Sequence, residues 1–159
     1  MQSINKNQVF IGGAALLLGL LIYLISRPLN HTYLGFFIRI PGTSSYWNPR
    51  FLNVIGGVLP SFLHVFAFSL LLGGLLACPK IGYLVICSAW LLIDVAFEAG
   101  QGQATFASRL IPAWFQEVFI LQNLRSYFLM GTFDFYDLGS TLVGALAAYC
   151  FLIFTMKEG

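Results

Sequence analysis

The chain has 159 residues, of which 58% are hydrophobic and only 9% are charged, and its mean hydropathy is +0.83. Soluble domains carry about 25% charged residues, so this composition excludes an ordinary soluble domain and indicates an integral membrane protein. The net charge of +2 and the lack of a basic run argue against a nucleic-acid partner. We expect one domain over residues 1–159 and no cofactor, because the three cysteines are too few for a disulfide framework or a zinc site.

Four apolar stretches are long enough to cross a membrane as helices. About 20 residues at about 1.5 Å per residue match a hydrocarbon core of about 30 Å. Only residues 78–80 separate the second and third stretches, so these two spans must be antiparallel neighbours. The expected fold is an all-α integral membrane protein with four transmembrane helices, at residues 9–25, 58–77, 81–100 and 137–156.

Two long connections join these spans, and both lie on the same side of the membrane. The first, residues 30–57, is rich in aromatic residues, prolines and glycines, and we expect it to dock as a cap at the level of the lipid headgroups. The second, residues 102–131, contains the segment Pro112–Phe128, whose apolar side chains gather near one face of a helix. This pattern predicts an amphipathic helix that lies in the membrane interface.

The third span carries polar residues where a membrane helix is normally apolar. Asp94, Glu98 and Gln101 follow the spacing i, i+4, i+7 and therefore share one face of a helix. A carboxylate at mid-bilayer depth costs roughly 3 kcal/mol, so it persists only where it faces protein, water or a ligand. The third span therefore indicates a polar site inside the membrane.

The alternating direction of four spans brings further polar residues to the same leaflet. One lies in the second span and two lie at the start of the fourth. We expect six residues to converge beneath the long connections as a ligand-binding cluster: His64, Asp94, Glu98, Gln101, Asp134 and Asp137. Because neighbouring carboxylates repel one another, such a cluster must share a proton, pair with an arginine or hold a cation.

Each of these residues also has a purely structural interpretation. His64 could bond to a neighbouring helix, Asp137 could cap the last helix, and Asp134 could be an interfacial loop charge. Arg109 or Arg125 could fold back onto the carboxylates of the third span. The histidine and carboxylates could instead hold Mg²⁺ or Ca²⁺. No catalytic residue is assigned, because the chain has no serine elbow, H-E-x-x-H, P-loop or zinc-ligand spacing.

Small residues four positions apart mark one face of the last span. They are Ser140, Gly144 and Ala148. Faces of this kind let membrane helices approach closely, so we expect this one to contact a neighbouring helix.

Three short motifs resemble the VanZ-like family of small bacterial membrane proteins. They are His-Val-Phe-Ala-Phe at 64–68, Phe-Glu-Ala-Gly-Gln at 97–101, and Gly-Thr-Phe-Asp-Phe-Tyr-Asp-Leu-Gly-Ser-Thr-Leu-Val-Gly-Ala at 131–145. The resemblance implies a multi-span helical fold in the bacterial inner membrane and a link to the cell envelope. The chain departs from the family pattern at Pro60 and Ser61, where an acidic-lysine pair is common, and at Thr141, where asparagine is common. The matching positions are His64, Glu98, Gln101, Asp134, Asp137 and Gly144.

Two functions are compatible with these observations. In the first, the chain is a VanZ-like inner-membrane protein whose polar site binds a lipid headgroup or an envelope precursor, so membrane lipids are its partners. In the second, it is a non-catalytic accessory subunit that binds other subunits of a larger membrane complex. A third function, metal-assisted hydrolysis, would use the histidine and carboxylates to activate water.

Overall fold

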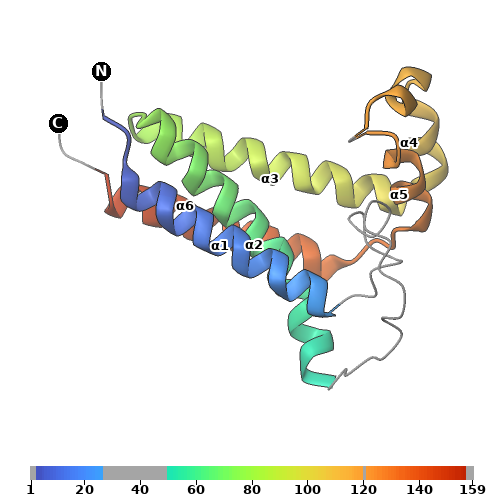
Figure 1. The fold of residues 1–159 in the computed structure, drawn as a ribbon, viewed down its shortest axis with the longest axis horizontal. Helices are drawn as coiled ribbons and strands as arrows, with labels where there is room; N and C mark the ends of the chain where they lie inside the picture. Colours follow the sequence, from blue (N-terminus) through green and yellow to red (C-terminus); the bar gives the residue numbers. More distant parts are fainter. Residues whose placement is uncertain (1–2, 27–49, 120, 157–159) are drawn as a thin grey trace.

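The computed structural model describes residues 3–26, 50–119 and 121–156. These residues contain no β-strand, and their four longest helices each include a stretch long and apolar enough to cross a membrane. The predicted all-α fold with four membrane-spanning helices is therefore confirmed (Figure 1). The helices are α1 (Lys6–Ser26), α2 (Arg50–Leu76), α3 (Lys80–Gly102) and α6 (Phe135–Phe154).

Helix α2 is the centre of the bundle. It packs against α1 on one side and α6 on another, while α3 packs mainly against α6 and α2. The buried core includes Leu70, Tyr83, Cys87, Ala148 and Leu152, from α2, α3 and α6. Toward its C-terminal end, α3 diverges from α1 and α2 (Figure 1). The bundle is thus closed at the end that carries the chain termini and open at the other.

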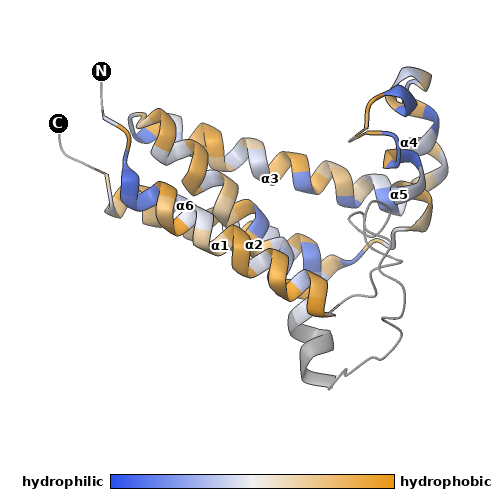
Figure 2. Ribbon diagram, in the orientation of Figure 1, coloured by the Kyte–Doolittle hydropathy of each residue, from blue (hydrophilic) through white to orange (hydrophobic). Residues whose placement is uncertain are grey.

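The outer surfaces of the long helices are apolar, as contact with lipid requires. Leu17 on α1, Leu92 on α3 and Leu146 on α6 are all more than half exposed. Figure 2 shows apolar residues along most of these four helices, with polar residues gathered near the helix ends and in the segment around α4 and α5. The chain is therefore a multi-pass membrane protein rather than a water-soluble bundle.

The first long connection is shorter than predicted. Residues 50–57 were expected in this connection, but they form the first turns of α2. Pro60 lies inside α2 and has no N–H for the carbonyl group of Gly56, and the helix changes direction in this region (Figure 1). The rest of the cap predicted for residues 30–57, residues 30–49, lies outside the described residues.

The second long connection is helical, but it is not one amphipathic helix. It consists of α4 (Ala104–Leu110), a 3-10 helix, η3 (Ala113–Glu117), and α5 (Leu124–Met130). The predicted helix over 112–128 is wrong because the backbone is extended at Val118 and turns before Asn123. A β-branched residue and an asparagine have low helix propensity and favour such a break. We call residues 104–130 the helical connection below.

Side chains at the start of α1 cap the end of α6. Asn5 donates its Nδ2 hydrogen to the carbonyl oxygen of Thr155 at 2.8 Å, and its Oδ1 accepts from the N–H of Gln8 at 3.4 Å. Gln8 is fully buried and donates from Nε2 to Thr155 Oγ1 at 2.9 Å and to the carbonyl of Leu152 at 3.2 Å. The last carbonyls of a helix have no partner within it, so these bonds satisfy the C-terminal end of α6.

Replacing Asn5 tests this link between the two ends of the chain. Asn5→Ala removes the cap of α1 and one bond to α6, so we expect the free energy of unfolding to fall by about 2 kcal/mol. Asn7→Ala is the matched control, because Asn7 is exposed, and it should change stability little. Thermal unfolding in detergent measures both variants, and equal midpoints would show that the link contributes nothing.

Candidate functional site

A cavity of about 870 Å³ lies at the open end of the bundle. Among the described residues, side chains from α1, α2, α3, α5 and α6 line it. Its apolar wall includes Leu16, Leu20 and Ile93. All six residues of the predicted polar cluster line the same cavity: His64, Asp94, Glu98, Gln101, Asp134 and Asp137.

At the inner end of this cavity, α2 and α3 are joined by a histidine–aspartate pair. The Nδ1 atom of His64 lies 3.4 Å from Oδ2 of Asp94. Asp94 is buried, with 9% of its surface exposed, whereas the side chain of His64 is 45% exposed. The tight turn between the two spans makes them antiparallel neighbours, and this brings the two residues to the same depth, as expected from the sequence.

Two aromatic side chains lie beside the imidazole ring of His64. Phe68 meets it edge-on with ring centroids 4.8 Å apart, and Trp90 lies 6.1 Å away. Phe68 and Trp90 also stack on each other at 4.6 Å. The histidine–aspartate pair therefore stands beside a small aromatic surface that faces the same cavity.

The start of α6 contributes a second polar pair. Ser61 of α2 donates its hydroxyl hydrogen to Oδ1 of Asp137 at 2.7 Å, and Asp137 is buried. The residue that caps α6 is Asp134, whose Oδ1 accepts from the N–H of Tyr136 at 2.8 Å. The alternative assignment of Asp137 as the cap is therefore wrong, because Asp137 lies within the first turn of the helix. The interpretation of Asp134 as an interfacial loop charge is also incomplete, because its side chain caps α6.

The end of α3 is attached to α6 and to the helical connection. Oε2 of Glu98 accepts from the backbone N–H of Asp134 at 3.4 Å. Gln101 donates from Nε2 to the hydroxyl oxygen of Tyr127 at 2.8 Å. Rings reinforce this attachment, because Phe97 of α3 stacks on Phe128 of α5 at 5.6 Å. These contacts hold the helical connection against the end of the diverging helix.

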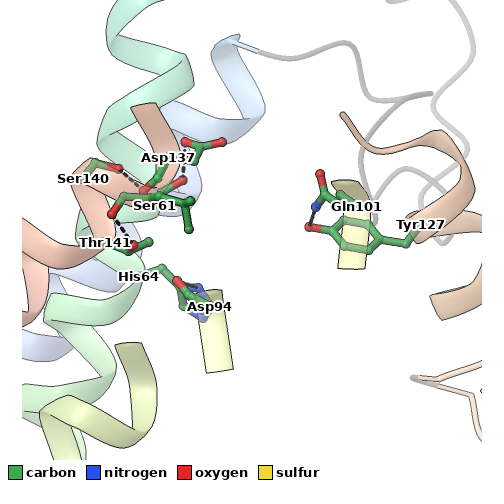
Figure 3. A network of polar contacts seen from close by, with 9 residues as sticks. Ser61, His64, Asp94, Gln101, Tyr127, Asp137, Ser140 and Thr141 are labelled. Carbon is green, nitrogen blue, oxygen red and sulfur yellow. Dashed lines mark hydrogen bonds and ion pairs between the residues drawn. The ribbon is translucent and has the colours of Figure 1, made fainter. Parts of the chain in front are cut away.

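The polar residues surround the cavity as separate pairs rather than as one ion cluster. Figure 3 shows the His64–Asp94 pair near Ser61 and Asp137, with Gln101 and Tyr127 set apart from these four residues. No group of three or more histidine, cysteine, aspartate or glutamate side chains in the described part of the chain could hold a metal ion. The interpretation as a Mg²⁺ or Ca²⁺ site, and metal-assisted hydrolysis with it, is therefore not supported.

The proposed ion-pair network with arginines of the second connection is also not formed. Within the described ranges, Arg109 and Arg125 make no ion pair with a carboxylate. The described residues that line the cavity include four carboxylates and no lysine or arginine. The described wall therefore offers oxygen atoms that can accept hydrogen bonds from a ligand.

Close packing of α6 against α2 brings the start of α6 to the cavity. Ser140, Gly144 and Ala148 are all buried. A β-carbon added to Gly144 would lie only 2.6 Å from the backbone carbonyl oxygen of Phe62. The predicted small-residue face thus lies against α2, and this contact brings Asp137 within hydrogen-bond distance of Ser61.

Several residues of the cavity wall were not assigned to the site from the sequence. Ser61 and Phe68 lie one turn before and one turn after His64, and Trp90 lies one turn before Asp94. Helical spacing could therefore have placed these three on the same faces as the predicted residues. No sequence pattern could have found Tyr127, because it reaches Gln101 from a separate helix.

Comparison of the chain with models of known families, with curated proteins and with solved structures gave no match. The fold and the cavity define a class of protein without further comparison. The chain is a multi-pass helical membrane protein with a polar cavity at one end of its bundle.

Proposed function

We propose that the chain is a VanZ-like protein of the bacterial inner membrane whose cavity binds the headgroup of a membrane lipid or of a lipid-linked envelope precursor. The observation that carries this proposal is the cavity itself. Its volume of about 870 Å³ lies within the range of about 300–1,000 Å³ that small-molecule sites occupy. Each of the four membrane-spanning helices contributes to its wall.

The two kinds of wall suit a molecule with a polar and an apolar part. Leu16, Leu20 and Ile93 offer an apolar surface, whereas Asp94 and Asp137 offer charged oxygen atoms. A soluble polar ligand would gain little from the first surface, and a hydrocarbon would be excluded by the second. An amphiphile fits both.

The position of the cavity also supports a ligand from the membrane surface. Exposed aromatic side chains occur throughout the neighbouring helical connection, including Phe106, Trp114 and Phe119. Aromatic residues favour the boundary between the hydrocarbon core and the headgroups, so the helical connection is suited to that layer. The cavity then opens at the level of the lipid headgroups.

The motifs that resemble the VanZ-like family come together at this cavity. His64, Glu98 and Asp137 belong to three separate motifs, and all three line the cavity wall. A shared binding site is a physical reason for such motifs to occur together in one chain. This coincidence supports the location of the site.

Filling the mouth of the cavity tests the proposal. Thr132 is exposed and lines the cavity, so Thr132→Trp should obstruct it without disturbing the helix contacts. We expect lipid that co-purifies with the wild-type protein to fall at least about tenfold in this variant, as measured by native mass spectrometry. Thr105→Trp is the matched control, because Thr105 is exposed on α4 outside the cavity wall.

The same measurement separates lipid binding from the role of an accessory subunit. Unchanged lipid in a folded Thr132→Trp protein would contradict the proposal. Co-purification of a stoichiometric membrane protein, with no lipid that depends on Thr132, would favour the accessory subunit instead.

A further inference from the structure

We infer that the inner end of this cavity is a binding site for a primary ammonium group. The site consists of His64, Phe68, Trp90 and Asp94, and its ligand is an amine that reaches it through the cavity. This inference rests on the proposed function only for the source of the amine. It specifies the chemistry of the headgroup, which the proposed function leaves open.

The carboxylate of Asp94 supplies the negative charge. Asp94 is buried within a membrane span, where an ionised carboxylate is strongly disfavoured unless a partner compensates for the lost water. Its partner among the described residues is His64, which carries no charge when the imidazole is neutral. A bound ammonium group would provide the missing positive charge in a region where Coulomb attraction is weakly screened.

The imidazole of His64 supplies a second hydrogen-bond acceptor. When Nδ1–H is donated to Asp94, the other ring nitrogen, Nε2, keeps its lone pair and can accept. The side chain is 45% exposed and lines the cavity, so a ligand can reach it. A primary ammonium group can donate either to Asp94 or to Nε2, which lie on opposite sides of the ring, whereas a quaternary ammonium group can donate to neither.

The stacked rings of Phe68 and Trp90 complete the site. Trp90 lies one turn before Asp94 on α3, and Phe68 lies one turn after His64 on α2, so both rings stand next to the polar pair. A cation within about 6 Å of a tryptophan or phenylalanine ring is attracted by the negative face of the ring. A carboxylate, an imidazole and two rings together form a surface that favours a cation over an anion.

This arrangement discriminates between classes of headgroup. A phosphate or pyrophosphate group that reached this depth would face Asp94 with no lysine or arginine among the described cavity residues to compensate. The phosphate of an aminophospholipid must therefore stay nearer the mouth, with its amine at the inner end. A free amine such as ethanolamine carries the same ammonium chemistry and could occupy the same position.

Native mass spectrometry of the purified full-length chain distinguishes these ligands. The protein is titrated with phosphatidylethanolamine, phosphatidylglycerol and phosphatidylcholine that share the same acyl chains, and separately with ethanolamine. We expect phosphatidylethanolamine to bind at least about tenfold more tightly than the other two lipids, because one charge-assisted hydrogen bond accounts for about that factor. Asp94→Asn should abolish this preference, whereas Glu117→Gln, at an exposed glutamate outside the cavity wall, should keep it.

A second variant keeps the test decisive if Asp94→Asn does not fold. Trp90→Leu retains the carboxylate and removes one ring, so it should weaken phosphatidylethanolamine binding and leave phosphatidylglycerol binding unchanged. Circular dichroism establishes that each variant retains its helices.

Each outcome bears on one proposal or on both. Equal or tighter binding of phosphatidylglycerol would overturn the ammonium site and leave lipid binding in place. Equal binding of phosphatidylcholine would overturn the requirement for a primary amine. Binding of ethanolamine without any lipid would support the ammonium site and overturn the proposed function. No binding in any arm would overturn both.

Discussion

Gly144→Leu is expected to destabilise the protein by at least about 3 kcal/mol, because the new side chain has no room between α6 and α2. The first added carbon atom would lie 2.6 Å from the carbonyl oxygen of Phe62, and this oxygen belongs to a helix backbone rather than to a flexible side chain. Relief of that overlap requires the two helices to separate. Separation would also pull Asp137 away from Ser61 and remove a 2.7 Å hydrogen bond from the cavity wall.

Gly139→Leu is the matched control for this prediction. Gly139 lies on the same helix, and a β-carbon added there would meet nothing within 4 Å. The two variants add the same atoms to α6 and differ only in the direction in which they point. The midpoint of thermal unfolding in detergent should fall strongly for Gly144→Leu and change little for Gly139→Leu. Equal stability of the two variants would show that the contact with α2 does not hold α6 in place.

Gly12→Leu should disrupt the contact between α1 and α2 and lower the free energy of unfolding by about 3 kcal/mol. A β-carbon at Gly12 would lie 2.9 Å from the carbonyl oxygen of Ala67 and 3.0 Å from the backbone nitrogen of Leu71. Both atoms belong to the α2 backbone, so the overlap cannot be relieved by a change of side-chain rotamer. Helix α1 would move away from α2 and carry the apolar cavity wall at Leu16 and Leu20 with it.

Gly13→Leu provides a control at the adjacent position. A β-carbon at Gly13 would meet nothing within 4 Å, so the larger side chain can extend outward from the bundle. We expect no loss of stability for this variant, and lipid binding should remain as in the wild-type protein. A loss of stability as large at Gly13 as at Gly12 would contradict the close contact between α1 and α2.

Together these two contacts explain how a bundle of apolar helices positions a polar site. Lipid tails are as apolar as leucine side chains, so helices in a membrane associate chiefly through close packing. Gly12 and Gly144 allow α1 and α6 to approach opposite sides of α2. Helix α3 packs into the core through Tyr83 and Cys87 near its start and diverges from α1 and α2 toward its C-terminal end (Figure 1), where its residues line the cavity.

The number of spans and their approximate positions could be predicted from the sequence because they depend on local properties, although α2 begins at Arg50 rather than at residue 58. Length and hydropathy decide whether a segment can cross the hydrocarbon core, and neither depends on what the segment packs against. The predicted start of the last span at Asp137 was only two residues from the observed start at Phe135. The sequence also predicted that the polar residues gather on one common side of the membrane, because this follows from the number of spans alone. The common face of Asp94, Glu98 and Gln101 followed from the period of the helix, and all three line the cavity.

The helical connection could not be predicted to the same accuracy. The apolar positions of residues 112–128 fit a helical period, but the same residues form a short 3-10 helix, a turn and the start of α5. Periodicity reports which faces are apolar and not whether the backbone continues unbroken. Contacts such as Phe97 with Phe128 and Gln101 with Tyr127 determine where this segment docks.

The pairing of the polar residues was decided only by the tertiary structure. From the sequence, Asp94 could have met an arginine, a metal ion or a histidine, and Asp137 could have capped its own helix. In the folded chain, Asp94 meets His64 and Asp137 meets Ser61. The physical reason is that a partner on another helix depends on how each helix is rotated about its axis and how closely it approaches its neighbour. Those quantities are set by backbone contacts such as that between Gly144 and Phe62, which the periodicity of a single helix does not contain.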